Sequence, residues 1–521
     1  MYEGLITLRK NLSKYIALLL ASSLILGGCS FGSKNNGSGK KKNTSSVSLQ
    51  MRIPTSLNPL LCENQSVRDA FSVCYEPLFL LNEKMLPEGV LARSINLTDD
   101  CMGAIITLKD SVLWHDGIKF TSADVVHTIS LLKGNPSSPY YECVKYIENA
   151  QSIDPLSLRL TLSRPYGQIA YSLYFPIVPV HKENIEDSMV GTGPYTLHKY
   201  TPSVLLEMKK FDSWHGGDAL SDKISISLIK DKESATQSFN AGMINTITNK
   251  SFDTENKVPR KNTRTTLFPS SEYEFLVFNH DSSPFSSSAI RSAVSSAINR
   301  EEIAKECYGT AAQAANLPLH PSSEKMAPSS SSVQYNLEHT REMLFLEGYT
   351  ANEKTHYLQN EKTGVLSFTL LVNKENESRK KCARVLQSQL SAAGIQMEIR
   401  ELDFASYVKA IQGGSFQAYL GGTKIGNLMD FEFLLSKNGA LNNYGYSDEA
   451  MEAALLALAS SASEEALRDT ASDFEELFLR TQPICGLVFK KDSLITADNI
   501  MGKLLPLMDY PYKNISKWTL K

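Results

Sequence analysis

Residues 366–422 read LSFTLLVNKENESRKKCARVLQSQLSAAGIQMEIRELDFASYVKAIQGGSFQAYLGG and alternate between strand patterns and helical patterns. Residues 366–372 and 395–399 alternate apolar and less apolar side chains, which is typical of half-buried strands. Residues 375–393 place alanine and leucine on one helical stripe and are followed by Gly394, which can adopt the left-handed conformation that stops a helix. A strand, a helix and a second strand in this order predict a right-handed parallel crossover unit.

The same alternation continues towards the end of this stretch. Asp403 is predicted to cap a second helix that ends at the glycine pair 413–414, and residues 416–420 are predicted to form a third strand. The region is therefore predicted to be an open α/β lobe, in which ligands bind beyond the carboxyl ends of the strands. Residues 421–424, Gly-Gly-Thr-Lys, are expected to form a loop that faces this crevice. The alternative is an ordinary tight turn, which two glycines also favour.

Two further helix starts can be predicted from capping residues. Asp124 is expected to cap or charge the start of a helix that follows Thr121. Ser461 and Glu464 form a capping-box pattern that predicts a helix running to about Arg480.

The N-terminus has the pattern of an export signal that ends at a cysteine. Lys10 and Lys14 precede an apolar run, residues 15–26. This run is shorter than the ~20 residues required to span a bilayer. The run ends in LGGC at residues 26–29, which resembles the lipobox of bacterial lipoproteins. The resemblance implies cleavage before Cys29 and acylation of both its thiol and its new amino group, which together give stable membrane attachment. A single transmembrane anchor is the alternative.

The rest of the chain has the composition of a large globular protein preceded by a tether. Residues 29–48 are polar and lysine-containing, so they are predicted to form a flexible tether. The 521 residues include 42% hydrophobic residues, which is enough for two or three domains with their own cores. The formal net charge of −3 shows no basic bias and argues against nucleic acid as a partner. Residues 322–332 are serine-rich and predicted to be a flexible loop.

Residues that could carry chemistry are scattered along the sequence. Seven cysteines remain besides Cys29 with no Cys-x-x-Cys pair, so one to three disulfides are possible and their connectivity stays open. The nine histidines lack a ligand spacing such as His-x-x-x-His, so neither a metal site nor a cofactor is predicted. The one Gly-x-Ser-x-Gly string, residues 28–32, overlaps the lipobox-like sequence, and no Walker-type phosphate loop is found, so the sequence does not favour an enzyme.

Short motifs follow one another in a fixed order over residues 50–490. They are SLNP at 56–59, YEPL at 75–78, WHDG at 114–117, GTGPY at 191–195, WHGG at 214–217, AGMIN at 241–245 and YGYS at 444–447. Together they resemble the large extracytoplasmic solute-binding proteins of oligopeptide, dipeptide and related ABC importers. The resemblance implies an α/β fold, a two-lobed periplasmic-binding-protein clamshell with an extra domain inserted in the first lobe.

The resemblance also implies a division of the chain and a function. The expected segments are a signal peptide at 1–28, the tether at 29–48, lobe 1 at 49–80, 190–280 and 490–521, an inserted domain at 81–189, and lobe 2 at 281–489. The expected protein is a lipid-anchored monomer on the periplasmic side of a bacterial cell envelope. It captures peptides by hinge closure and delivers them to an ABC permease in the inner membrane. Alternatives are a member specialised for an acidic or cell-wall peptide, a metal or haem, and a surface adhesin or chaperone without a transport role.

Some ligand contacts are implied by the same resemblance. The family segment after the SLNP motif lines the cleft with an acidic residue, which corresponds here to Glu63, with Asn64 and Gln65 beside it. Tyr140 corresponds to a tyrosine that touches the peptide, and Tyr141 is the fallback. The alternatives are a solvated loop carboxylate for Glu63 and a ring packed between domains for Tyr140.

The clearest departure from the family follows the third predicted strand. Relatives usually place there an aspartate that holds the amino terminus of the peptide, but Gly426 occupies the corresponding position, and Asp430 does not match in register. Gly422, Thr423 and Lys424 are candidate ligand contacts. A lysine in a closing cleft requires an anion, so an acidic group on the ligand is expected. The alternative is that Lys424 points to solvent.

Overall fold

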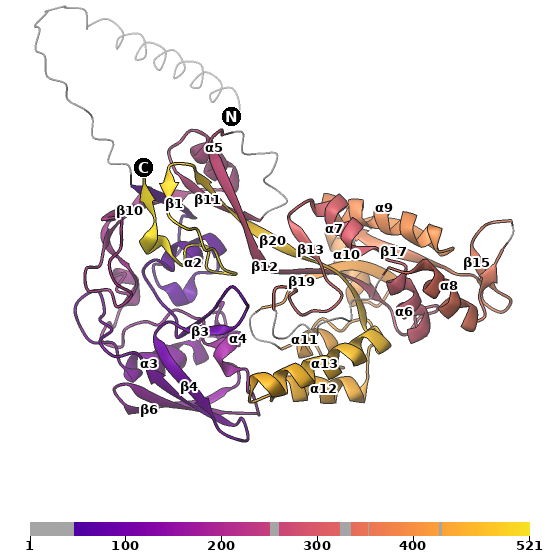
Figure 1. Ribbon diagram of the computed structural model, residues 1–521, viewed down its shortest axis with the longest axis horizontal. Helices are drawn as coiled ribbons and strands as arrows, with labels where there is room; N and C mark the ends of the chain where they lie inside the picture. The colour runs from indigo at the N-terminus through magenta and orange to yellow at the C-terminus, as the bar shows by residue number, and fades with distance from the viewer. Residues whose placement is uncertain (1–45, 251–259, 324–334, 353, 427–429) are drawn as a thin grey trace, which may run out of the picture. The chain divides into compact units, whose positions relative to one another are not determined.

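The computed structural model describes residues 46–250, 260–323, 335–352, 354–426 and 430–521 (Figure 1). The predicted signal peptide, most of the tether, Cys29 and most of the predicted serine-rich loop lie outside these ranges. No helix within these ranges has both the length and the apolar character that crossing a membrane requires.

The first lobe and its inserted domain are built on two four-stranded sheets. One has the order β1-β10-β9-β8, with β1 parallel to β10, and the other has the antiparallel order β4-β5-β7-β6. The strands are β1 Val47–Arg52, β4 Ala92–Leu97, β5 Gly103–Leu108, β6 Ile147–Asp154, β7 Ser157–Leu162, β8 Tyr195–Thr201, β9 Leu205–Lys210 and β10 Lys223–Ile229. The helices are α2 Gln65–Phe71, α3 Ser122–Lys133, α4 Tyr141–Val144 and α5 Lys232–Asn240. Apolar side chains of both sheets share one buried core.

The second lobe is built around the third sheet, of order β11-β20-β12-β19-β17-β18, with β13 also paired to β20. Its strands are β11 Thr246–Lys250, β12 Thr263–Phe278, β13 Ala312–Ala314, β17 Ser367–Asn373, β18 Gln396–Leu402, β19 Ala418–Lys424 and β20 Ile484–Ala497. The helices are α6 Ser288–Ser296, α7 Arg300–Tyr308, α8 Leu337–Leu346, α9 Glu377–Ala392, α10 Phe404–Gln412, α11 Glu432–Leu435, α12 Glu449–Ala459 and α13 Glu464–Thr481. Leu370 and Leu371, neighbours on β17, belong to different cores, so helices cover both faces of this sheet.

Two long strands, β12 and β20, lie side by side and connect the lobes (Figure 1). Phe268 and Leu494 belong to the core of the first lobe, whereas Tyr273 and Phe489 belong to a core of the second. The pairing shifts register between Pro269 and Tyr273, so the ladder is irregular where the strands pass from one lobe to the other. The described chain is thus a two-lobed α/β clamshell with an extra domain in its first lobe. The exact domain boundaries stay a prediction.

The crossover unit predicted from residues 366–422 is confirmed. β17 and β18 pair in parallel around α9, and Gly394 has φ +86° after the helix. Asp403 caps α10, because its carboxylate accepts a hydrogen bond from the Ser406 amide at 3.0 Å.

The predicted loop or turn at residues 421–424 is wrong. These residues are the second half of β19, which pairs with β12 from Ala418 to Lys424. Pairing with a neighbouring strand that is distant in sequence outweighs the local preference of two glycines for a turn.

The capping box predicted at Ser461 is also wrong, because the residue that caps the helix lies two positions later. Ser463, in extended conformation, caps α13, and its hydroxyl accepts from the Ala466 amide at 3.1 Å. Ser461 is buried, and its hydroxyl donates to the Ala457 carbonyl at 3.0 Å. Asp124, by contrast, lies in the first turn of α3 as expected, and its carboxylate accepts from the Thr121 amide in a capping box.

Three of the motifs noted in the sequence meet at one buried carboxylate. Glu76 accepts hydrogen bonds from the Thr192 hydroxyl at 2.9 Å, the Trp214 indole at 3.1 Å and the His215 ring at 2.9 Å. Its side chain is only 9% exposed. Glu76 therefore joins the segment before β2 (Phe79–Leu81) to the segments on either side of β8 and β9.

The seven cysteines of the described ranges are all free thiols, so none of the possible disulfides is present among them. Cys307 on α7 and Cys382 on α9 are within hydrogen-bond reach of each other. Cys382 is buried and Cys307 is half-buried.

Candidate functional site

A cavity of about 540 Å³ is lined by residues of both lobes. The first lobe and its inserted domain contribute Gln65, Arg68, Tyr75, Tyr140, Lys145 and Tyr174, the second contributes Lys424, Gly426, Asp430 and Phe433, and the C-terminal segment contributes Asp509 and Tyr510. The volume lies in the range of small-molecule and peptide-fragment sites, and tyrosines with a few charged groups are a common lining for such sites.

Arg68 shapes one wall of this cavity. Its guanidinium donates to the backbone carbonyls of Cys62 and Glu63 and to the side chain of Gln65. The Asn64 side chain caps α2 by accepting from the Ser66 amide at 3.0 Å. Because Arg68 belongs to α2, these contacts attach the preceding loop to the helix, and the helix thereby holds this wall of the cavity in place.

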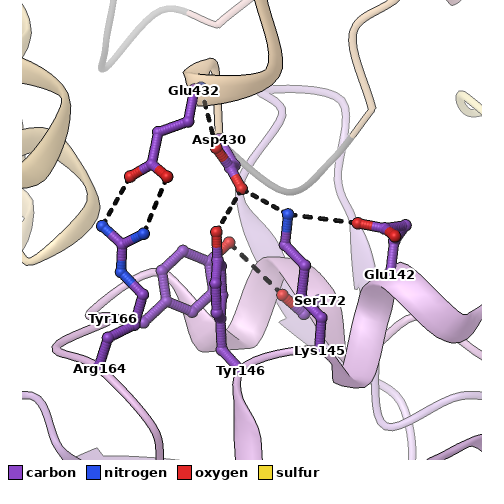
Figure 2. A network of polar contacts seen from close by, with 8 residues as sticks. All are labelled: Glu142, Lys145, Tyr146, Arg164, Tyr166, Ser172, Asp430 and Glu432. Atoms are coloured by element: carbon purple, nitrogen blue, oxygen red, sulfur yellow. Dashed lines mark hydrogen bonds and ion pairs between the residues drawn. The ribbon is translucent and has the colours of Figure 1, made fainter. Parts of the chain in front are cut away.

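A polar network links the two lobes beside the cavity (Figure 2). Lys145 and Tyr146 both donate to the same oxygen of Asp430, each at 2.7 Å. Arg164 forms a bidentate pair with Glu432 at 2.7 and 2.9 Å. Lys145 and Asp430 are 285 positions apart in sequence, so only the folded chain brings them together.

Asp430 and Lys145 are both charged at neutral pH. Burial alone would raise the pKa of Asp430, but the hydrogen bonds and charge of Lys145 outweigh burial and lower this pKa. Burial would likewise lower the pKa of Lys145, but Asp430 outweighs it and raises that pKa. The pair is therefore a true ionic contact between the lobes.

The lobes also touch just after Tyr166, at residues 167 and 168. The Gly167 amide donates to the Ala459 carbonyl at 2.8 Å, and the Gln168 side chain donates to the Ser461 carbonyl at 2.8 Å. A Cβ atom at Gly167 would lie 2.0 Å from the Ser461 carbonyl oxygen. The approach is so close that only glycine fits at this position.

Three of the predicted ligand contacts line the cavity: Gln65, Tyr140 and Lys424. Burial raises the pKa of Tyr140, whose ring also packs against Tyr174 with centroids 6.2 Å apart. Lys424 is exposed, and although its backbone pairs with Glu272 of β12, its side chain makes no hydrogen bond or ion pair to any residue of the described ranges.

The other predicted contacts lie outside this cavity. Glu63 is exposed, and Asn64 lines a second cavity that adjoins the first. Gly422 lies against the buried ion pair of Arg379 and Glu274, and Thr423 pairs with β12. Whether any of these residues contacts a ligand stays a prediction.

No sequence motif points to several of the lining residues. Arg68, Lys145 and Asp509 stand in no recognisable motif, and their positions depend on contacts between distant segments. Asp509 has φ +59°, a conformation that is uncommon outside glycine and that occurs often at functional sites. The sequence offers Asp430 only as a substitute for an aspartate at Gly426 and does not predict its pairing with Lys145.

Comparison with known proteins finds one matching family. Residues 87–445 match the model of the bacterial extracellular solute-binding proteins, family 5. The oligopeptide-binding protein AppA of Bacillus subtilis is 24% identical over 550 residues, covering 98% of this chain and 99% of AppA. The glutathione-binding protein GsiB of Escherichia coli K12 is 24% identical over 413 residues, covering 77% of this chain and 76% of GsiB.

Solved structures share the fold of this chain. The Campylobacter jejuni protein NikZ, solved with Ni(L-His), superposes with a TM-score of 0.65 at 21% identity, covering 91% of this chain and 99% of NikZ. AppA of B. subtilis, solved with a nonapeptide, superposes with a TM-score of 0.61 at 21% identity, covering 92% of this chain and 99% of AppA. At these identities the likeness establishes the fold.

Proposed function

The chain belongs to family 5 of the bacterial extracellular solute-binding proteins, and from this membership we propose that it binds peptides between its two lobes and passes them unaltered to an ABC permease. The observation that carries the proposal is the 540 Å³ cavity, whose walls come from both lobes. A ligand held there contacts both lobes at once, so its binding energy favours the closed arrangement.

The chemistry of the lining favours a peptide over a metal ion. The described residues that line the cavity include tyrosines and charges of both signs but neither histidine nor cysteine. Peptides carry amide groups, an amine and a carboxylate, which such a lining can bind directly or through water. The names of AppA and GsiB, which refer to peptide ligands, support the same class.

Closure would occur by rotation of the lobes about β12 and β20. The irregular pairing between Pro269 and Tyr273 lies between the two cores, where a bend disturbs the fewest buried contacts. The Lys145–Asp430 and Arg164–Glu432 pairs would then hold the lobes together.

Attachment to the membrane completes the proposal. Cys29, after the lipobox-like LGGC sequence, would carry the lipid, and residues 30–48 would give the binding protein reach towards its permease. A monomer tethered in this way stays close to the permease on the periplasmic side of the envelope.

The proposal can be tested by identifying the bound molecule. Native mass spectrometry of protein purified without denaturation is expected to show adducts with the masses of short, intact peptides. Incubation with those peptides should leave them uncleaved. Cleaved products, or a bound molecule that contains no peptide, would contradict the proposed function.

Lys424→Ala tests whether the cavity selects an acidic group. Lys424 is the exposed cation of the lining without a described partner, so a ligand carboxylate near it would gain a charge-assisted hydrogen bond. We expect the variant to bind peptides with an acidic side chain roughly tenfold more weakly and matched neutral peptides equally well, as measured by calorimetry. Lys437→Ala, outside the cavity lining, is the control. Equal affinities across the panel would exclude selection by Lys424.

A further inference from the structure

Helices α7 and α9 lie against each other in the second lobe (Figure 1). Near the start of α7, the Glu302 carboxylate accepts a hydrogen bond at 2.8 Å from the side-chain amide of Gln389, near the end of α9. Near the end of α7, the Glu306 carbonyl accepts one from the ammonium of Lys381, near the start of α9. The two helices therefore run in opposite directions, and their register is fixed at both ends.

Two cysteines meet in this helix interface. Cys307 follows Glu306 on α7 and Cys382 follows Lys381 on α9, so the contact between those two residues also brings the thiols together. The Cys382 thiol is within hydrogen-bond reach of Cys307, and both side chains pack in the same apolar core of the lobe. A disulfide requires two cysteines whose side chains already approach each other in this way.

The two thiols differ in exposure and in acidity. Cys307 is half-buried, whereas the other six cysteines of the described ranges are buried. The hydrogen bond from Cys382 lowers the pKa of Cys307, and the charge of Lys381 adds to this effect. The same hydrogen bond, together with burial, raises the pKa of Cys382 well above its usual value. Because the thiolate is the form that attacks a disulfide, Cys307 is the thiol that reacts first.

The location of the family supplies the conditions for oxidation. Family 5 binding proteins are extracytoplasmic. Disulfides form and persist in such compartments, whereas the cytosol keeps thiols reduced. A thiol that is half-buried, such as Cys307, can meet an oxidant there while the chain stays folded.

We propose that Cys307 and Cys382 are a modification site, at which an extracytoplasmic disulfide oxidant, such as glutathione disulfide or the active-site disulfide of a thiol oxidase, forms a disulfide between α7 and α9. This inference goes beyond the proposed function and does not depend on it, because it concerns a helix interface within one lobe.

The disulfide forms in two exchanges. The Cys307 thiolate attacks one sulfur of the oxidant, the S–S bond of the oxidant breaks, and one of its sulfurs leaves as a thiolate and takes up a proton from water. Cys382 then attacks the Cys307 sulfur of this mixed disulfide, and the second oxidant sulfur leaves with the proton that Cys382 loses. The two cysteines are thereby oxidised by two electrons, and the oxidant is reduced to two thiols.

The disulfide would brace a helix that contacts both strands connecting the lobes. Arg379 lies one turn before Cys382 on α9, and its guanidinium donates to the Glu274 carboxylate of β12 at 2.7 and 3.2 Å. Lys490 of β20 pairs with the same carboxylate at 2.7 Å. A covalent link at Cys382 therefore restrains the helix that holds these ion pairs. It also closes the chain between the two cysteines into a loop, which restricts the unfolded state.

The test uses the full chain, first reduced and then incubated without denaturant with glutathione disulfide. Free thiols are trapped with N-ethylmaleimide, and the tryptic peptides are identified by mass spectrometry. Oxidised wild-type protein is expected to yield a linked pair of peptides, residues 306–325 with residues 382–384. The midpoint of thermal unfolding should rise by roughly 3–5 °C on oxidation and return on reduction.

Single serine variants separate the two roles. Cys382→Ser keeps the attacking thiol and a hydroxyl that can donate to it, but cannot complete the second exchange, so glutathione should accumulate on Cys307. Cys307→Ser should carry roughly tenfold less glutathione on Cys382, because that thiol is buried. Cys143→Ser, which removes a buried thiol of the first lobe, is the control and should still form the linked pair.

Each outcome decides for or against the inference. Circular dichroism verifies that every variant is folded before oxidation. The linked pair in folded wild-type protein, together with glutathione on Cys307 in the Cys382→Ser variant, supports the modification site. Absence of the linked pair, its formation only in urea, or a lasting glutathione adduct on wild-type Cys307 would overturn it. An unfolding midpoint that the link leaves unchanged would overturn the bracing of α9.

Discussion

Glu76→Ala is expected to lower the free energy of unfolding by about 3–5 kcal/mol, because it breaks a buried network that joins three segments of the first lobe. The substitution removes the common acceptor of Thr192, Trp214 and His215. Thr192 is then left unpaired in the interior, where an unpaired polar group costs about 1–3 kcal/mol, and the half-buried Trp214 and His215 lose their acceptor as well. The cavity left by the side chain adds to the loss.

Urea unfolding followed by circular dichroism measures this effect. Glu76→Gln retains an acceptor oxygen and should lose less stability than the alanine variant. Glu83→Ala, at an exposed position, is the control and should change stability by less than about 0.5 kcal/mol. A Glu76→Ala protein as stable as the control would show that the three segments are held together by their apolar contacts alone.

Gly167→Ala is expected to weaken ligand binding while leaving each lobe folded. The new Cβ atom would lie 2.0 Å from the Ser461 carbonyl oxygen and 2.6 Å from its carbon, and both are backbone atoms of the opposite lobe. Neither can rotate away, so the lobes must move apart or the turn between α12 and α13 must shift. Because the proposed binding requires the lobes to close on the ligand, we expect affinity to fall roughly tenfold or more.

Small-angle scattering with and without peptide, together with calorimetry, would measure this change. Gly134→Ala is the control, since its Cβ would meet its nearest neighbour at 3.5 Å, an ordinary contact. The Gly167 variant should show a larger radius of gyration in the presence of peptide than the control does. Identical scattering and affinity for the two variants would mean that this interlobe contact plays no part in closure.

The parts of the fold that could be predicted from the sequence are those set by local pattern. The crossover unit around α9 follows from periodicity and from Gly394, and the cap at Asp403 follows from residue type. Where two residues of one type compete, local pattern does not decide: Ser461 and Ser463 are both serines near the helix start, but only the Ser463 hydroxyl accepts from the Ala466 amide, whereas Ser461 donates to the Ala457 carbonyl. The clamshell itself was expected from the motifs of the family.

The residues of the candidate ligand site can be predicted from the sequence less completely than the fold. Gln65, Tyr140 and Lys424 were expected at the ligand, and they do line the cavity, although no ligand contact is established. The pairing of Lys145 with Asp430 could not be predicted, because it depends on how two distant segments pack in three dimensions. The glycines at 421 and 422 favour a turn when only neighbouring residues are considered. They form a strand because they pair with β12, which is more than a hundred residues away in sequence.

The half-buried thiol of Cys307 can be labelled with a dye to follow the proposed motion of the lobes. A hydrogen bond from Cys382 lowers the pKa of Cys307, whereas the other described cysteines are buried. In a protein that begins at residue 46, a maleimide dye should therefore attach at this position first. With a second dye on an engineered cysteine in the inserted domain, energy transfer between the two dyes would report the distance between the lobes. The proposed opening and closing could then be followed in single molecules.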